Sequence, residues 1–183
     1  MIYEGSLMKK LKKVIHNTQY DDQFFFEYIE YPEFDFEASK AKLIHSQYAE
    51  VEKSEKKIIY EDGSEFILPI SEIMEVLADR SGFMVIYGRV PSRFSKEKKY
   101  PWFFDRPNNA AIYNANGNLR CQIQNPWKDG YIFSFAQPSI KYPNLPSVIL
   151  DYEDNPYDSS FYDLYAVDTK TGELLETMQQ IRR

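Results

Sequence analysis

The residues able to perform acid–base or nucleophilic chemistry are few in this 183-residue chain, which has two histidines and one cysteine. Neither His16 nor His45 belongs to an H-E-x-x-H sequence or to another metal-ligand spacing, and both fall in segments predicted to be helical. Cys121 falls on the apolar face of a predicted hairpin, with no neighbouring base to activate a thiolate. These patterns predict structural roles for all three side chains, no catalytic residue, no metal site and no cofactor.

Carboxylates that are close together in the sequence leave one enzymatic alternative open. The pairs are Asp21 with Asp22, Glu153 with Asp154, and Glu30 with Glu33. Paired carboxylates serve glycosidases and metal-dependent hydrolases, so an uncharacterised hydrolase is the second alternative function. The 7 glycines include no G-x-G-x-x-G or G-K-[ST] arrangement, so nucleotide binding through these motifs is not expected.

A segment in the C-terminal part of the chain interleaves acidic and aromatic residues. Its sequence, DYEDNPYDSSFYDLYAVD (residues 151–168), has six carboxylates, five aromatic rings and neither lysine nor arginine. Carboxylates steer a positively charged protein into an encounter, and buried tyrosines contribute much of the affinity at interfaces. The pattern predicts that residues 151–165 form the contact face for a basic partner protein. The predicted partner-binding residues are Asp151, Glu153, Asp154, Tyr157, Asp158, Tyr162 and Asp163.

Two other segments compete for a binding role. Residues 20–37 are also acidic and aromatic, because seven carboxylates but no lysine or arginine occur between Lys13 and Lys40. Residues 89–106 combine six basic and five aromatic residues, a composition typical of platforms for single-stranded nucleic acid. The net charge of −6 favours an exposed loop for residues 89–106, and direct contact with nucleic acid is not expected.

Composition predicts a protein of the cytoplasm that does not bind a membrane. No apolar run approaches the length of about 18 residues that spans a bilayer. Cys121 is the only cysteine, so an intrachain disulfide is impossible and a reducing compartment is favoured. Residues 6–16 contain four lysines, which a solvated helix explains better than attachment to a membrane surface.

The pattern of elements predicts a single α+β domain over residues 1–183. Apolar residues at steps of three and four predict helices over 6–16, 37–57 and 71–82, so the helices lie mostly in the N-terminal half. The first of these helices is expected to be a peripheral appendage. The remainder is expected to form a twisted antiparallel β-sheet built from hairpins, with strands near residues 83–90, 109–124, 131–137 and 147–153.

Glycines mark the turns of three predicted hairpins. Gly63 follows an aspartate and Gly117 an asparagine, as in type I′ turns, and Gly172 is expected in the left-handed conformation. The three glycines are 54 and then 55 residues apart, a spacing typical of a propeller or solenoid. However, a predicted helix follows the first hairpin and two predicted strands follow the second. We therefore interpret the spacing as coincidence.

In size, charge and content the chain resembles the immunity proteins that neutralise bacterial polymorphic and contact-dependent inhibition toxins. The resemblance rests on the tyrosine-rich acidic tract DYEDNPYDSSFYD, on the β-rich body and on the closing hairpin LYAVDTKTGELLE. It is a resemblance of type, and it implies a non-enzymatic monomer or dimer that covers a cognate toxin, often a basic nuclease, at or near its active site. A carbohydrate- or small-ligand-binding β module, with Trp102, Trp127 and tyrosines as exposed stacking platforms, is the first alternative.

Overall fold

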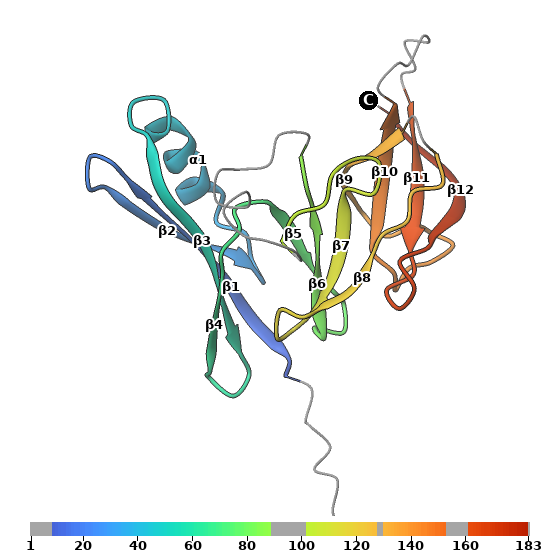
Figure 1. Ribbon diagram of the computed structural model, residues 1–183, viewed down its shortest axis with the longest axis horizontal. Helices are drawn as coiled ribbons and strands as arrows, with labels where there is room; N and C mark the ends of the chain where they lie inside the picture. Colours follow the sequence, from blue (N-terminus) through green and yellow to red (C-terminus); the bar gives the residue numbers. More distant parts are fainter. Residues whose placement is uncertain (1–8, 89–101, 128–129, 153–160, 183) are drawn as a thin grey trace, which may run out of the picture.

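The chain folds into antiparallel β-sheets with one helix. The computed structural model describes residues 9–88, 102–127, 130–152 and 161–182. Within these ranges twelve strands form three sheets of four strands, and the sheets follow one another along the chain (Figure 1). The prediction of an α+β domain is therefore right in its antiparallel hairpins and wrong in its share of helix.

Each sheet is built from four strands that are consecutive in the sequence. Sheet I has the spatial order β2-β1-β3-β4 and contains β1 (Leu11–Tyr20), β2 (Phe25–Tyr31), β3 (Val51–Tyr60) and β4 (Glu65–Leu68), with α1 (Phe36–His45) between β2 and β3. Sheet II contains β5 (Ile73–Val76), β6 (Gly82–Ile86), β7 (Ala110–Asn114) and β8 (Leu119–Gln122) in chain order. Sheet III contains, also in chain order, β9 (Gly130–Ala136), β10 (Ser147–Tyr152), β11 (Phe161–Val167) and β12 (Leu174–Arg182).

Sheet II is the middle layer, and both of its faces are buried (Figure 1). Phe83 and Val85 of β6 belong to the core shared with sheet I, whereas Met84 and Ile86 belong to the core shared with sheet III. Every residue of β6 is buried. A strand buried on both sides needs apolar residues without alternation, and this confirms a central strand within the predicted segment 83–90.

The helix predicted over residues 6–16 is wrong in its described part, because β1 begins at Leu11. Leu11 and Val14 both face the core between sheets I and II although they are three residues apart. The pairing of β1 with β3 is irregular between Leu11 and Lys13, and such a bulge places residues at helical spacing on one face of a strand. The apolar spacing that indicated a helix is thus produced by a bulged strand.

The helix predicted over residues 71–82 is also wrong, because β5 and β6 form a hairpin there. Arg80 adopts the left-handed conformation in its turn (φ 58°), a position that glycine usually marks. Gly82, expected as a left-handed helix cap, instead begins β6, where a β-carbon would overlap the carbonyl oxygen of Tyr113. The close approach of two strands therefore requires this glycine.

The three hairpin glycines occupy the same position in their respective sheets. Gly63 (φ 81°), Gly117 (φ 84°) and Gly172 (φ 78°) each lie in the turn between the third and fourth strands of a sheet. Their regular spacing therefore reflects three consecutive four-stranded sheets, and its interpretation as coincidence is wrong. The first two turns are not type I′, since Asp62 and Asn116 do not share the positive φ of the glycines that follow them.

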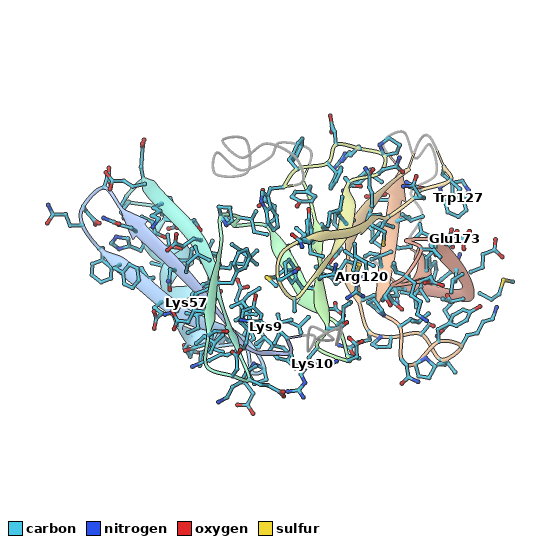
Figure 2. The ribbon with its side chains drawn as sticks, turned by 60° about the horizontal axis from the view of Figure 1, so that its bottom comes forward. Lys9, Lys10, Lys57, Arg120, Trp127 and Glu173 are labelled. Carbon is cyan, nitrogen blue, oxygen red and sulfur yellow. The ribbon has the colours of Figure 1, made fainter. Side chains whose placement is uncertain are left out.

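Arg120 connects sheet II to sheet III (Figure 2). Its guanidinium donates hydrogen bonds to the carbonyl oxygen of Ser81 at 3.2 Å, before β6, and to that of Thr169 at 3.5 Å, after β11. A parallel bridge between Gln124 and Glu173 forms a second link between the two sheets. These polar contacts supplement the shared apolar core.

Glu75 on β5 gives a pH-dependent prediction for stability. Its side chain is half-buried, and burial raises the pKa of its carboxyl from 4.5 to about 7. The folded state therefore binds this proton more tightly than the unfolded chain does, so stability falls as the pH rises from about 4.5 to about 7. We expect Glu75→Gln to raise the free energy of unfolding by about 1 kcal/mol at pH 8 and to leave it unchanged at pH 4, as measured by urea denaturation.

The control for this prediction is Glu65→Gln, which changes an exposed carboxylate on β4. The control should alter the pH dependence of unfolding little. If both variants respond to pH alike, burial of Glu75 does not govern the effect.

Candidate functional site

The predicted contact face at residues 151–165 lies partly outside the described residues. Four of its seven named members, Glu153, Asp154, Tyr157 and Asp158, fall in the segment between β10 and β11 that the structure does not describe. Their role in a contact stays a prediction.

The three described members of this face lie on β10 and β11. Asp151 is 8% exposed, and its carboxylate accepts a hydrogen bond from the Tyr131 hydroxyl at 3.3 Å. The predicted surface position of Asp151 is therefore corrected to a buried one, on a strand that pairs on both sides. Tyr162 is half-buried and stacks on Phe133 with 5.5 Å between ring centres, and Asp163 is half-buried beside it.

The second acidic segment, residues 20–37, lies in sheet I at the opposite end of the molecule (Figure 1). It contains the turn between β1 and β2, β2 itself and the start of α1. Asp35 caps α1, because its carboxylate accepts a hydrogen bond from the backbone N–H of Ala38. The helix predicted over residues 37–57 is right at its start, but α1 ends at His45, a turn follows over residues 46–50, and β3 begins at Val51.

The apolar side chains of α1 point to solvent. Phe36, Leu43 and Ile44 are 74%, 68% and 50% exposed, and no residue of α1 is buried. A helix on the surface of a globular protein normally turns its apolar stripe toward the core. Here the opposite side, which is half-buried, consists of small and polar residues: Ala38, Ser39, Lys42 and His45.

Exposed apolar residues are concentrated around this helix. Of the thirteen large apolar side chains that are exposed in the described ranges, seven lie between residues 24 and 48: Phe24, Phe25, Phe34, Phe36, Leu43, Ile44 and Tyr48. Exposed carboxylates accompany them at Glu33, Asp35 and Glu37. We define the α1 surface as Phe34, Phe36, Leu43, Ile44 and Tyr48 together with these three carboxylates.

Aromatic and polar contacts hold α1 on sheet I. The Tyr20 hydroxyl donates to the carbonyl oxygen of Lys42 at 3.2 Å and lies 2.6 Å from the Ser46 hydroxyl. The ring of His45 lies 4.7 Å from the ring centres of both Tyr20 and Phe24. The helix is therefore positioned by a few specific contacts rather than by burial of an apolar stripe.

A cluster of ionisable side chains lies in sheet I, where α1 contacts it. His16 on β1 has Nδ1 2.8 Å from Oε1 of Glu30 on β2 and Nε2 2.8 Å from the Ser54 hydroxyl on β3. Lys56 on β3 donates to both carboxylate oxygens of Glu30, at 2.5 and 2.6 Å. From α1, Lys42 places Nζ 3.4 Å from Nε2 of His16.

The electrostatics of this cluster follow from burial and from the single carboxylate at its centre. Burial alone would raise the pKa of Glu30, but the hydrogen bond from His16 and the charge of Lys56 lower it to about 2. Burial lowers the pKa of Lys56, which the Glu30 carboxylate opposes. Burial also lowers the pKa of His16. The hydrogen bond to Glu30 opposes this shift, and the charges of Lys56 and Lys42 add to it. Glu30 is thus the counter-ion of a buried lysine.

Glu30, His16 and Ser54 follow the order carboxylate, imidazole, hydroxyl, which is the order of an acid–base relay in serine hydrolases. A nucleophilic hydroxyl must reach the substrate carbonyl, yet Ser54 is 5% exposed and lies beside Lys42 of the covering helix. The arrangement is therefore suited to holding sheet I and α1 together, and substrate has no access to it.

The remaining candidates from the sequence pack inside the protein. Trp102 stacks on Tyr113 with 4.8 Å between ring centres, and Trp127 lies 4.9 Å from the ring of Tyr165. Both tryptophans adjoin a core and are half-buried, so their predicted exposed positions are corrected to half-buried ones. Cys121 adjoins the core between sheets II and III, and burial raises the pKa of its thiol, in agreement with the predicted structural role.

Neither the ionic cluster nor the outward face of α1 was predicted from the sequence. A signal for the first was present: on β3 the buried positions alternate as Ser54, Lys56, Ile58 and Tyr60, so two polar residues continue an apolar inward row. No sequence signal distinguishes an apolar helix face that points outward from one that points inward.

Comparisons with protein-family models, with curated proteins and with solved structures returned no match for this chain. Among the described residues, no helix is long and apolar enough to cross a membrane. The same residues include no group of three or more histidine, cysteine, aspartate or glutamate side chains that could hold a metal ion.

Proposed function

We propose that this protein is a non-enzymatic binding protein that neutralises a basic partner protein, in the manner of the immunity proteins it resembles, and that the α1 surface makes the contact. The observation that carries the proposal is the outward orientation of Phe36, Leu43 and Ile44. Contiguous exposed apolar side chains with a polar rim mark interaction sites on soluble proteins.

Burial of this surface supplies the affinity. Aromatic side chains dominate the energetics of protein interfaces, and Phe34 and Phe36 already contact each other edge to face, with 4.9 Å between ring centres. Because the two rings already contact each other in the free protein, part of their side-chain entropy is lost before a partner binds.

Charge decides the kind of partner. Glu33, Asp35 and Glu37 lie beside the exposed apolar residues, and the one basic residue on the exposed face of α1 is Lys40. A second copy of the chain would bring like charges together, since each copy carries a net charge of −6. A basic protein meets complementary charge and is steered into the encounter.

The α1 surface and the predicted face at residues 151–165 are alternative contact regions. We favour the α1 surface because its carboxylates and apolar side chains are exposed together, whereas Asp151 is buried and Tyr162 is partly covered by Phe133. Both regions are acidic, so both fit the same class of partner.

The proposal is tested with the C-terminal domain of each large secreted protein encoded beside the gene for this chain. We expect one such domain to be basic, to stop growth when expressed alone, and to be harmless when co-expressed with this protein. The purified pair should form a one-to-one complex with a Kd of about 10 nM or below. If no neighbouring domain is both toxic and neutralised, the proposal is wrong.

A further inference from the structure

The contact between α1 and the buried cluster depends on the protonation state of His16. With Nδ1 2.8 Å from the Glu30 carboxylate, the neutral ring carries its proton on Nδ1 and donates it to Oε1. Nε2 is then an acceptor, for the Ser54 hydroxyl at 2.8 Å and for the Lys42 ammonium at 3.4 Å. The contact between Lys42 and sheet I thus uses the lone pair on Nε2 of His16, and protonation of Nε2 would remove this acceptor.

Protonation of His16 reverses this contact. Nε2–H can still donate to the Ser54 oxygen, because a hydroxyl both donates and accepts. Lys42, however, loses its acceptor and lies 3.4 Å from a second positive charge. Lys56 lies 3.5 Å from Nδ1 on the other side of the ring, so Glu30, the one carboxylate hydrogen-bonded to the ring and to Lys56 among the described residues, would face three cations. The charge of Glu72 acts on Lys56 in addition. Repulsion therefore falls on α1, the element with no buried residue.

We propose that His16 is a proton-operated switch for α1: the neutral ring keeps the helix docked on sheet I, and the protonated ring releases it. The consequence for partner binding rests on the proposed function, since release of α1 would dismantle the α1 surface. The protein would then hold its partner near neutral pH and release it in an acidic environment.

All elements that pack around His16 contribute to this switch. From β2, Glu30 and Tyr28 face Nδ1, with the Tyr28 hydroxyl at 3.1 Å. From β3, Ser54 and Lys56 flank the ring, and from α1 the facing charge is Lys42.

The second histidine near this contact, His45, lies on α1 itself, and its Nε2 is 2.9 Å from the Asp22 carboxylate. A substitution of His45 therefore serves as the control for the switch at His16.

The direction of the pH effect follows from linkage. Burial lowers the pKa of His16 in the docked state below the 6.5 of a solvated histidine, although the Glu30 hydrogen bond opposes the shift. The released state consequently binds the proton more tightly. Docking is fully favoured above pH 6.5 and weakens as the pH falls below it, by up to about tenfold in the docking equilibrium for each pH unit.

Hydrogen exchange of the α1 amides tests the switch without any partner. Exchange rates of residues 36–45 are measured between pH 8.0 and 5.5, divided by the intrinsic chemical rates, and compared with amides of β6. We expect the parent to open α1 more often at pH 5.5 than at pH 6.5, by up to about fivefold. Lys42→Met keeps the aliphatic stem and removes the charge, and it should change less than about twofold over the same interval.

Two further measurements complete the test. His45→Gln should respond to pH as the parent does. NMR titration of the His16 ring should give a midpoint below 6.5 that rises in Lys42→Met. A parent whose α1 protection does not depend on pH, or a Lys42→Met variant that responds as the parent does, overturns the switch. This test uses no partner, so its outcome does not depend on the proposed function. If α1 responds to pH as expected but no basic partner is found, the switch stands and only the proposed function is refuted.

Discussion

Replacing Glu30 by glutamine is expected to lower the free energy of unfolding by about 3 to 5 kcal/mol at pH 7, because Lys56 would remain buried without a counter-ion. Lys56 is 2% exposed, and both Glu30 oxygens accept its hydrogen bonds. A loss of this size is a large part of the about 5 to 15 kcal/mol that stabilises a typical domain. Denaturation in urea, followed by fluorescence, measures it.

The matched control is the double variant Glu30→Gln with Lys56→Met. A buried ion pair can be replaced by uncharged side chains of similar volume at little cost, and His16 can still donate to the glutamine oxygen. We expect the double variant to recover most of the lost stability. A single variant that loses less than about 1 kcal/mol, or a double variant as unstable as the single one, contradicts this view of the cluster.

Truncating Phe36 and Leu43 to alanine is expected to weaken partner binding by about 1 to 3 kcal/mol for each side chain, mainly through faster dissociation. Both side chains are largely exposed in the free protein, so thermal unfolding should shift little. Surface plasmon resonance of the parent and of the double variant Phe36→Ala with Leu43→Ala measures the effect. The combined loss should exceed about tenfold in Kd.

The control for this prediction removes equally exposed apolar side chains elsewhere. Ile73 on β5 and Ile140 between β9 and β10 are 65% and 86% exposed, and Ile73→Ala with Ile140→Ala should leave the affinity unchanged. If the control weakens binding as much as the α1 variant does, the loss of affinity does not depend on where the exposed apolar side chains lie. In that case the α1 surface is not the site of contact.

Hairpins could be predicted from this sequence because their signals are local. Gly63, Gly117 and Gly172 each require a backbone conformation that few other residues adopt, and each turn lies where the glycine predicts it. Arg80 shows the limit of such signals. It adopts the left-handed conformation, but arginine rarely does so, and its presence in the sequence therefore does not indicate a turn. The hairpin of β5 and β6 was therefore hidden.

Two of the helix predictions are wrong over strands, β1 and β3, whose sequences do not alternate strictly between apolar and polar residues. A bulge brings Leu11 and Val14 to the same face of β1. On β3, Ser54 and Lys56 occupy buried positions that apolar residues normally fill, because they bind His16 and Glu30. Because these two polar residues fill buried positions, the sequence of β3 lacks the apolar alternation typical of a strand. The helix was therefore predicted to extend over it to residue 57.

The sequence predicts that the contact site is acidic and aromatic, but it does not predict which segment of the chain forms it. The charge pattern identifies residues 20–37 and 151–168 as acidic and aromatic, and it cannot rank them. Their ranking depends on which side chains are exposed, and therefore on the orientation of α1 and on the burial of Asp151. Both are set by contacts between segments far apart in the sequence.

The α1 surface is tested most directly by two charge-reversal variants whose binding to the same toxic partner domain is compared. One variant combines Glu33→Lys with Glu37→Lys on the α1 surface, and the other combines Asp154→Lys with Asp158→Lys. Association and dissociation rates are measured for each at low and at physiological salt. We expect the α1 variant to associate at least about tenfold more slowly and to lose the salt dependence of its association rate, while the other variant stays within about threefold of the parent. The opposite ranking, or two variants that both bind as the parent does, would contradict the α1 surface as the site of contact.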